Sequence, residues 1–374
     1  MDRLQNIFWL GIKELRSLQR DPVIVLLLIY SFTFSIYSMA TGISSEVHHA
    51  SIALVDEDRS ALSRQIANAF YEPYFREPQL ISTEEIDPGM DQGLFMFVLN
   101  IPPRFEADVL TGRQPEIQVN IDATAVMQAS IGTSYIQNII SDEIRRFMQG
   151  ENERNTYPVE LVTRTAFNPN RTSSWFHSIV AIINQVTMLT IVLTGAALIR
   201  EREHGTIEHL LVMPLTAFDI AMAKVWANGL VILMATIVSL LFVVEGILSV
   251  PIAGSKALFL GGTVLYLFFA TALGIFLGTI ARSMAQFALL IILVILPLDL
   301  LSGGSTPVES QPDWLQTITL YLPSRHFVSF SQAVIYRGAG LDIVWPELFA
   351  VACLGLVFFI FSLGLFRRSI ALSN

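Results

Sequence analysis

Six long apolar runs divide the chain, and polar or charged residues separate each run from the next. The runs cover residues 23–43, 175–199, 225–248, 257–280, 284–301 and 348–366. A helix rises about 1.5 Å per residue, and the hydrocarbon core of a bilayer is about 30 Å thick. Runs of this length predict an α-helical integral membrane protein with six transmembrane helices. An even number of spans places both termini on the same side.

The polar stretch between the first two runs, residues 44–174, has a different pattern. Strands are predicted over residues 50–55, over the apolar run 94–101 that ends at Pro102 and Pro103, and over residues 116–121, where apolar positions alternate. Helices are predicted over residues 60–71, 105–111 and 126–149. Strands and helices that alternate over such a length are enough for a small α/β core. We therefore expect an α/β domain over residues 44–174, inserted between helices 1 and 2.

A second polar stretch, residues 303–346, separates the last two runs. Gly303 and Gly304 interrupt the chain after the fifth run, and short amphipathic helices are predicted over residues 314–321 and 325–336. Trp314 and His326 lie in these helices, and both residue types suit a membrane interface. We expect short re-entrant helices between spans 5 and 6 that form an external lid, with Gly303, Gly304, Trp314 and His326 as its marked residues.

The N-terminal segment, residues 1–22, has apolar residues on one helical face and basic residues away from it. The apolar stripe comprises Leu4, Ile7, Phe8, Gly11, Leu15 and Leu18, and the basic residues are Arg3, Lys13, Arg16 and Arg20. This pattern predicts an amphipathic helix in the plane of the membrane interface. Asp21 and Pro22 predict a break before the first span.

The distribution of basic residues in short loops predicts the orientation. With the N-terminus in the cytoplasm, the inner side holds ten Lys or Arg residues and the short outer loops hold three. Cytoplasmic loops of membrane proteins are enriched in such residues. Both termini and residues 200–214 are therefore expected in the cytoplasm, and residues 44–174 outside.

Composition adds three constraints. The chain is 53% hydrophobic with a mean hydropathy of +0.56, which fits an integral membrane protein. Residues 44–174 contain ten Arg, no Lys and nineteen Asp or Glu, so the whole net charge of −9 lies there. Such a surface argues against nucleic acid and is compatible with a basic or amphiphilic protein partner, although solubility alone would also explain it. Cys353 is the single cysteine, so no intrachain disulfide can form.

Motifs for catalysis or metal binding are missing from the sequence. No G-x-x-x-x-G-K-[ST] motif occurs, so this chain is not expected to hydrolyse ATP or to bind a cofactor itself. His204, Glu208 and His209 do not form an H-E-x-x-H motif, so no metal site is predicted. Ser302, His326 and Asp299 could form a catalytic triad, but no G-x-S-x-G motif supports that interpretation.

Polar and aromatic residues within the first two spans are candidates for a substrate pathway. They are Tyr30, Phe34 and Tyr37 in the first span and Asn184, Gln185 and Thr187 in the second. Polar residues within spans mark a pathway more often than a lipid-facing surface. An aromatic, weakly polar cavity suits an amphipathic organic molecule better than an inorganic ion. The same aromatic residues could instead pack span against span.

A charged segment, residues 200–214, follows the second run directly and is too polar to lie in hydrocarbon. It is expected to be a short helix held at the cytoplasmic face, where another protein could dock. The chain resembles the type-2 ABC permease family in four strings. The most specific string includes the start of this segment and is Leu198-Ile199-Arg200-Glu201-Arg202-Glu203-His204-Gly205-Thr206-Ile207-Glu208. The others are Asn6-Ile7-Phe8, Gly11-Ile12-Lys13-Glu14-Leu15 and Phe167-Asn168-Pro169-Asn170. The branch that the chain is most similar to is that of efflux permeases with a large periplasmic domain.

The resemblance implies a half-transporter of the bacterial inner membrane that dimerises with a second permease and pairs with two separate ABC ATPase subunits, which bind ATP and magnesium. The segment after the second span would be the coupling helix, with Arg200, Glu201, Arg202, Glu203, Gly205, Thr206 and Glu208 as coupling residues. A periplasmic adaptor and an outer-membrane channel are further partners that the branch implies. The expected function is ATP-driven export of an amphiphilic, drug-like or lipid-like molecule by alternating access. A non-transporting membrane scaffold or receptor with an external sensing domain is the alternative.

Overall fold

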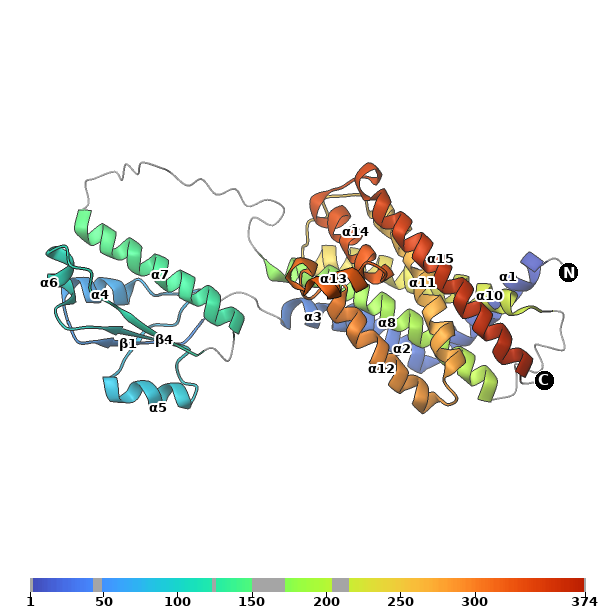
Figure 1. The fold of residues 1–374 in the computed structure, drawn as a ribbon, viewed down its shortest axis with the longest axis horizontal. Helices are drawn as coiled ribbons and strands as arrows, with labels where there is room; N and C mark the ends of the chain where they lie inside the picture. The colour runs from blue at the N-terminus through green and yellow to red at the C-terminus, as the bar shows by residue number, and fades with distance from the viewer. Residues whose placement is uncertain (1–2, 43–48, 123–125, 150–171, 204–214, 373–374) are drawn as a thin grey trace. The chain divides into compact units, whose positions relative to one another are not determined.

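The computed structural model describes residues 3–42, 49–122, 126–149, 172–203 and 215–372. The chain divides into two compact units, a helical unit of residues 1–43 and 165–374 and an α/β unit of residues 44–164 (Figure 1). Among the described residues of the helical unit, six helices are long and apolar enough to cross a membrane, as predicted.

The helical unit begins with α1 (Arg3–Arg20), and the first span combines α2 (Pro22–Tyr30), a π-helical turn (Ser31–Ser35) and α3 (Ile36–Gly42). The remaining elements are α8 (Ser173–Glu203), α10 (Ala217–Val238) with a π-helical continuation (Ser239–Ile247), α11 (Lys256–Ile280), α12 (Met284–Leu301), α13 (Asp313–Thr319), α14 (Pro323–Arg337) and α15 (Leu341–Leu372). The second and sixth spans are longer than their apolar runs, because α8 continues to Glu203 and α15 begins at Leu341.

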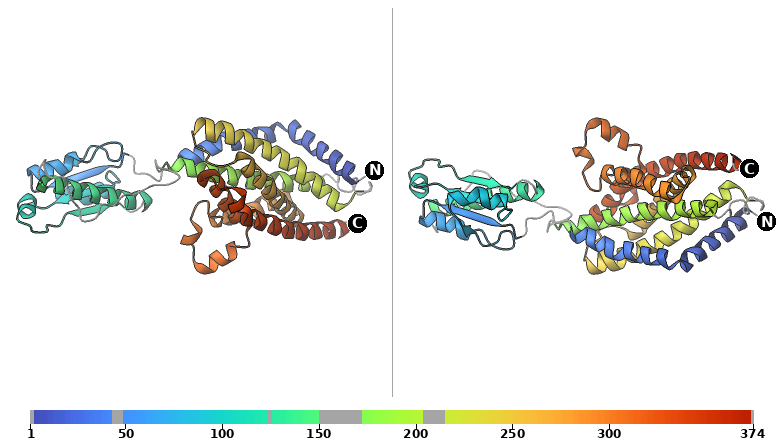
Figure 2. Two further views of the ribbon diagram at one scale, coloured as in Figure 1. Left: turned by 90° about the horizontal axis from the view of Figure 1, so that it is seen from above. Right: turned by 90° about the horizontal axis from the view of Figure 1, so that it is seen from below.

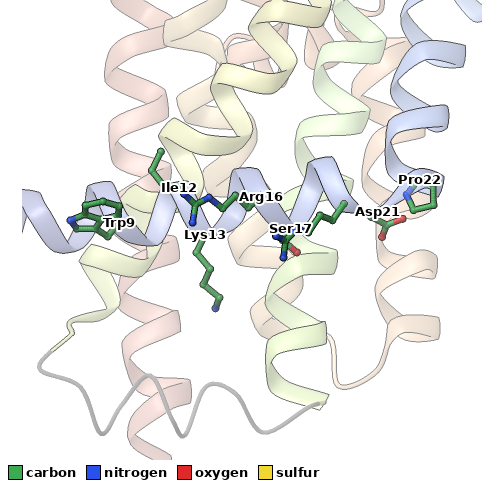
Figure 3. Close-up of a pocket in the computed structure, with 8 residues that line it drawn as sticks. Trp9, Ile12, Lys13, Arg16, Ser17, Asp21 and Pro22 are labelled. Atoms are coloured by element: carbon green, nitrogen blue, oxygen red, sulfur yellow. The ribbon is translucent and has the colours of Figure 1, made fainter.

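The corner between α1 and α2 is built by two residues. Asp21 accepts hydrogen bonds from the backbone N–H groups of Val23 and Ile24 at 3.1 and 3.3 Å, and Pro22 occupies the first helical position. A carboxylate cap and a proline at these positions start a new helix, because they satisfy or remove backbone donors that have no helical partner. Figure 3 shows α2 rising from the end of α1 at this corner.

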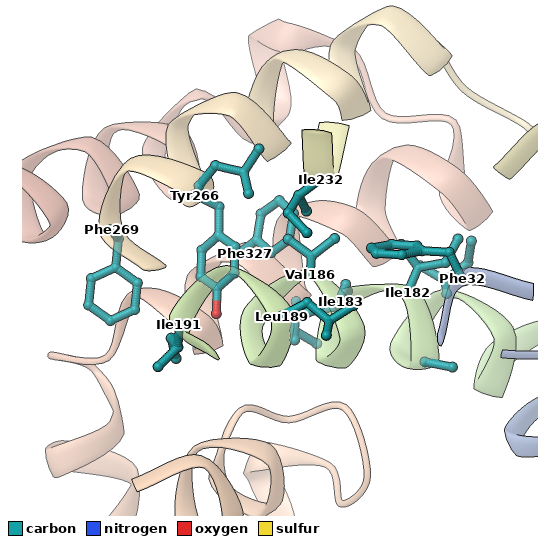
Figure 4. Close-up of a cluster of buried hydrophobic side chains, with 14 of the residues drawn as sticks. Phe32, Ile182, Ile183, Val186, Leu189, Ile191, Ile232, Tyr266, Phe269 and Phe327 are labelled. Carbon is teal, nitrogen blue, oxygen red and sulfur yellow. The ribbon is translucent and has the colours of Figure 1, made fainter. Parts of the chain in front are cut away.

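α8 is the central helix of the helical unit. Within its apolar window 78% of the residues are buried, compared with 17% in α12 and 22% in the first span. Figure 4 shows Ile182, Ile183, Val186 and Leu189 of α8 among side chains from the neighbouring helices. The first span, α12 and α15 therefore form the outer helices, whose exposed apolar side chains suit lipid or a second subunit.

Small residues allow α12 and α11 to approach α8. A Cβ atom at Gly195 of α8 would lie 2.2 Å from the ring of Phe287 and 2.9 Å from the carbonyl oxygen of Gly274. Phe287 is buried on α12, and Gly274 lies on α11. Close approach of this kind is how helices pack in membranes, where apolar burial alone gives little driving force between helices.

The α/β unit contains a four-stranded sheet in the order β2-β1-β3-β4. Its elements are β1 (Ile52–Asp56), α4 (Ala61–Asn68), β2 (Gln79–Leu80), a 3₁₀ turn (Thr83–Glu85), α5 (Ile86–Asp91), β3 (Phe97–Ile101), α6 (Phe105–Leu110), β4 (Gln118–Ile121) and α7 (Val126–Gln149). β1 pairs in parallel with β2 and β3, and β4 is antiparallel to β3.

Helices cover both faces of this sheet, with α7 on one face and α5 on the other (Figure 1). The core on the α7 side contains Ile52, Leu54, Phe97, Leu99, Leu62, Phe105 and Ile136, and the core on the α5 side contains Ala53, Val55, Val98 and Ile86. Strands buried on both faces read as continuous apolar runs. Neither β2 nor α5 was predicted, because β2 has two residues and α5 contains Pro88 and Gly89.

We expect Gly195→Ala to lower the stability of the helical unit. The added methyl group would collide with the buried Phe287 ring and with backbone, and overpacking of this kind costs about 1–3 kcal/mol. The matched control is Gly261→Ala on α11, where a Cβ atom would meet nothing within 4 Å. Thermal unfolding in detergent should show a lower midpoint for Gly195→Ala and no fall for Gly261→Ala. Equal midpoints for the two variants would contradict the close packing of α8, α11 and α12.

Candidate functional site

The last turn of α8 carries four consecutive charged residues, Arg200, Glu201, Arg202 and Glu203. The sequence had placed them in a separate cytoplasmic segment after the span. In the structure these four residues belong to the same helix as the second apolar run, because α8 continues without interruption to Glu203. The other coupling residues predicted, Gly205, Thr206 and Glu208, lie outside the described residues.

Glu201 belongs to a buried ion cluster at the meeting point of three helices. The Nζ atom of Lys224 on α10 lies 3.1 Å from Oε1 of Glu14 on α1 and 3.1 Å from Oε2 of Glu201 on α8. Lys224 is 1% exposed, and both carboxylates are mostly buried. A buried ammonium is tolerated only with such partners, because its desolvation would otherwise be costly. Lys224 therefore fixes α1, α8 and α10 to one another.

The cluster changes the pKa of the Glu14 carboxyl group. Burial alone would raise the pKa of the Glu14 carboxyl group, but attraction to the Lys224 ammonium and hydrogen bonds with Glu201 and Lys224 outweigh burial and lower that pKa. Lys13, also on α1, contributes at the rim of the cluster, where its Nζ atom lies 3.9 Å from Oε1 of Glu201. Glu14 is therefore held in the ionised form that Lys224 requires.

The remaining three charged residues of the turn contact other helix ends. Arg200 lies 3.4 Å from Asp21 at the corner of α1 and α2. Arg202 donates to the carbonyl oxygens of Ala281 at 2.8 Å and Thr279 at 3.4 Å, where α11 ends. Backbone carbonyls at a helix C-terminus have no helical partner and attract cations.

Glu203 completes the set at the start of α12. Its Oε1 atom accepts a hydrogen bond from the backbone N–H of Met284 at 3.3 Å. A carboxylate is favoured at a helix N-terminus, where N–H groups lack partners. The last turn of α8 thus contacts α1, α2, α10, α11 and α12 through four consecutive side chains.

A second contact holds α1 against α10, which run side by side in Figure 2. A Cβ atom at Gly11 of α1 would lie 2.1 Å from the Trp226 ring, so only glycine fits there. The Trp226 indole N–H donates to the carbonyl oxygen of Ile7 at 3.1 Å, and its ring stacks on Phe8 with centroids 5.8 Å apart. α1 is therefore packed on the spans as well as amphipathic.

Sequence reasoning missed Lys224, Glu14 and Trp226 as site residues. The third apolar run was predicted to begin at residue 225, so Lys224 was placed in a loop. A signal was available, because Lys224 and Asn228 share one face of a helix at i, i+4 spacing, and both are buried. Asn228 donates to Thr194 of α8 at 2.9 Å, which extends the polar contact of α10 with α8 by one turn.

The residues predicted to line a substrate pathway divide into two groups. Gln185 donates to Ser35 at 2.8 Å, and Thr187 lies 2.8 Å from the hydroxyl of Tyr266, so both are engaged in the buried core. The other residues are accessible to different degrees: Asn184 is half-buried, and Tyr30, Phe34 and Tyr37 are 52%, 59% and 44% exposed. The structure thus leaves the aromatic residues of the first span exposed at the surface of the bundle, whereas Gln185 and Thr187 are buried.

The predicted external lid residues lie around the segment that contains α13 and α14. Gly303 has a positive φ of 88°, and Gly304 packs against Val180 of α8. Trp314 on α13 is 66% exposed. His326 on α14 lies 2.5 Å from Glu347 on α15 and contacts the carbonyl oxygen of Leu320 at 2.9 Å. A cavity of about 310 Å³ is lined here by residues that include Gly303, His326 and Glu347.

Comparison with known proteins identifies the family. Residues 22–363 match the family described as ABC-2 family transporter protein. The chain belongs to the ABC-2 transporter family. This confirms the resemblance seen in the sequence, and residues 22–363 include the six candidate spans of the described residues except the last turns of α15.

Relatives of this ABC-2 permease cover nearly its whole length. It is 54% identical to the inner membrane transport permease YhhJ of Escherichia coli K12 over 370 residues, 99% of both chains. It is 29% identical to the probable multidrug ABC transporter permease YbhR of the same organism over 364 residues, 96% of this chain and 97% of that one. The likeness to YbhS, also named a probable multidrug ABC transporter permease, is 26% over 343 residues, 88% of both chains. All three relatives are named as permeases.

In this ABC-2 permease we expect Lys224→Met to be strongly destabilising. Removing one partner of a buried ion pair costs about 3–5 kcal/mol, because it leaves an uncompensated buried charge. Lys256→Met is the control, since Lys256 pairs with Glu245 at an exposed site, where such pairs contribute about 0–1 kcal/mol. The midpoint of thermal unfolding should fall for Lys224→Met and recover in part when Glu201→Gln is added. An unchanged midpoint for Lys224→Met would contradict the structural role of the cluster.

His326 should give the permease a pH-dependent contribution to stability. The hydrogen bond to Glu347 raises the pKa of His326 although burial opposes it, and the Leu320 carbonyl accepts from the other ring nitrogen. A raised pKa means that the stabilisation is full below the ordinary histidine pKa of about 6.5 and is lost as pH rises through the raised value. The difference in thermal midpoint between wild type and His326→Gln should therefore shrink as pH rises from about 6 to about 9. A constant difference across this range would refute the ion pair.

Proposed function

We propose that this ABC-2 permease is the membrane-spanning subunit of an ATP-driven exporter and that the last turn of α8 transmits the motion of a separate ATPase to the spans. One observation carries the proposal: Arg200, Glu201, Arg202 and Glu203 contact five other helices, of which α2, α11 and α12 are contacted at an end. Displacement of this turn would move those helix ends together. The contacts are charged and directional, so they can transmit a displacement of the turn to the contacted helices in either direction.

The site of ATPase docking in this proposal begins where α8 ends. The side chains of the last turn are engaged within the chain, so the ATPase would contact mainly the residues that follow, among them Gly205, Thr206 and Glu208. The sequence lacks a P-loop, which supports hydrolysis of magnesium-bound ATP on a different chain. The excess of Lys and Arg near this end of the spans supports a cytoplasmic location for it and for both termini.

A second permease subunit would complete the pathway. The first span and α12 leave broad apolar surfaces uncovered, including Tyr30, Phe34 and Tyr37, and such surfaces suit a partner helix or an apolar substrate. We propose that these surfaces face each other across a dimer, homomeric or heteromeric, and line a cavity with Asn184. An aromatic lining suits an amphiphilic drug-like or lipid-like molecule, and the names of YbhR and YbhS as probable multidrug permeases agree with this.

Export would proceed past α13 and α14, which we propose as re-entrant lid helices at the outer face with Gly303, Gly304, Trp314 and His326. The α/β unit would then lie in the periplasm of a bacterial inner membrane. Its acidic composition is compatible with docking of a periplasmic adaptor that leads to an outer-membrane channel. A scaffold or receptor without transport is the second candidate, and co-purification with an ATPase would favour the exporter.

The role of the α8 turn is testable by charge reversal. Glu203→Lys would place a cation at the N-terminus of α12, where the helix dipole opposes it. In vesicles that contain the permease and its ATPase, we expect transport to fall about 5–150-fold, the range of typical coupling energies, while ATP hydrolysis falls less. Glu208→Lys, in the proposed docking segment, should reduce stimulation of the ATPase itself.

Arg282→Gln is the matched control for charge reversal, because Arg282 lies at the same corner and its guanidinium pairs with no residue that the structure describes. It should leave transport unchanged. Wild-type transport and ATP hydrolysis in Glu203→Lys would contradict the proposed transmission. Failure to co-purify any ATPase with wild type would instead favour the scaffold.

A further inference from the structure

One face of α1 is largely exposed, although Lys13 on this face lies 3.9 Å from Glu201 of α8. Trp9, Ile12, Lys13, Arg16, Ser17 and Arg20 recur at spacings of three and four residues, so they lie along one side of the helix. Together with Asp21 and Pro22 they line an open groove of about 660 Å³. The buried residues of α1, Gly11 and Leu18, are not among them.

The groove carries an excess of positive charge. Three of its residues, Lys13, Arg16 and Arg20, are basic, and Asp21 is its one acidic residue. Asp21 already caps the start of α2 and contacts Arg200 at 3.4 Å. Arg16 and Arg20 are exposed and form no ion pair with the described part of the chain. The groove is therefore complementary to an anion.

Apolar side chains accompany these cations on the same helix. Leu4, Phe8 and Trp9 are 80%, 53% and 58% exposed. In Figure 3, Ile12 points to the side of α1 from which α2 rises, and Lys13 points to the opposite side. Because α2 begins a membrane span, Ile12 points toward hydrocarbon and Lys13 toward water or headgroups. A soluble inorganic anion could not bury these apolar side chains, whereas a lipid with acyl chains could.

We propose that this groove binds the headgroup of an anionic phospholipid, with the phosphate between Arg16 and Arg20 and the acyl chains beside Trp9 and Ile12. The two arginines lie four residues apart, about 6 Å along the helix axis, which allows both to reach one phosphate diester. Arginine also suits phosphate through its planar set of donors. The bound lipid would hold α1 in the interface beside the Lys224 cluster, and so would stabilise the position of the α8 turn.

Fluorescence quenching by brominated lipids tests this proposal on the full-length permease. The protein is placed in vesicles that contain either brominated phosphatidylglycerol or brominated phosphatidylcholine at equal content. The contribution of Trp9 is obtained by subtracting the signal of Trp9→Phe, because the chain has five tryptophans. Trp9 should be quenched more strongly by the brominated phosphatidylglycerol. The preference should fall about fivefold for each arginine removed in Arg16→Gln and Arg20→Gln.

Controls separate the lipid from other occupants. Arg282→Gln, which removes a basic residue outside the groove, should keep the preference. For wild type the preference should weaken as salt is raised, because exposed charges are screened, and this measurement needs no arginine variant to fold. Equal quenching by the two lipids, or an unchanged preference in the double variant Arg16→Gln/Arg20→Gln, would overturn the proposal.

Two further results would assign the groove to something else. If inorganic phosphate at millimolar concentration abolished the preference at constant ionic strength, the site would be one for a free anion. If the double variant kept its lipid preference but lost co-purification with the ATPase, the groove would belong to the protein interface. Either result would overturn the lipid assignment, and neither would alter the proposed role of the α8 turn.

Discussion

The buried ammonium of Lys224 is the constraint on which the arrangement of this permease rests. It lies between Glu14 and Glu201 at 3.1 Å from each, in surroundings that exclude water. The desolvation cost of such a cluster is met only when α1, α8 and α10 keep their positions together. Hydrophobic packing between membrane helices could tolerate sliding, but a buried ion cluster allows one register.

Next to this cluster, the charged last turn of α8 also contacts the ends of other helices. Arg202 contacts the last carbonyl groups of α11 and Glu203 the first N–H group of α12, so each charge meets the helix end that attracts it. The outer helices are less constrained: α12 is largely exposed beyond Phe287, Ile295 and Leu298. One end of the bundle is thus joined by charged contacts, whereas the outer helices are loosely packed, as the proposed transmission of motion requires.

The sequence could predict most helices and strands but not the contacts between them. Six spans follow from apolar length, and the α1–α2 corner from Asp21 and Pro22. In the α/β unit, α7 was predicted at its observed bounds, whereas β2 and α5 carry too short a pattern. The charged string of α8 was singled out as a candidate site, but its partners within the chain were not predicted, because Glu14 and Lys224 are 210 positions apart. Gln185 and Thr187 looked alike in sequence to Asn184, and only packing distinguishes them.

Distances between spin labels would test the central claim that the α8 turn and the neighbouring helix ends move as one body. Labels would be attached to cysteines at Gln19 on α1 and Arg282 after α11, in a Cys353→Ser background because Cys353 is exposed. The permease would be measured with its ATPase, with and without ATP. We predict that this distance stays constant while the distance between the Arg282 labels of two permease subunits changes. An ATP-dependent change between Gln19 and Arg282 would contradict the account.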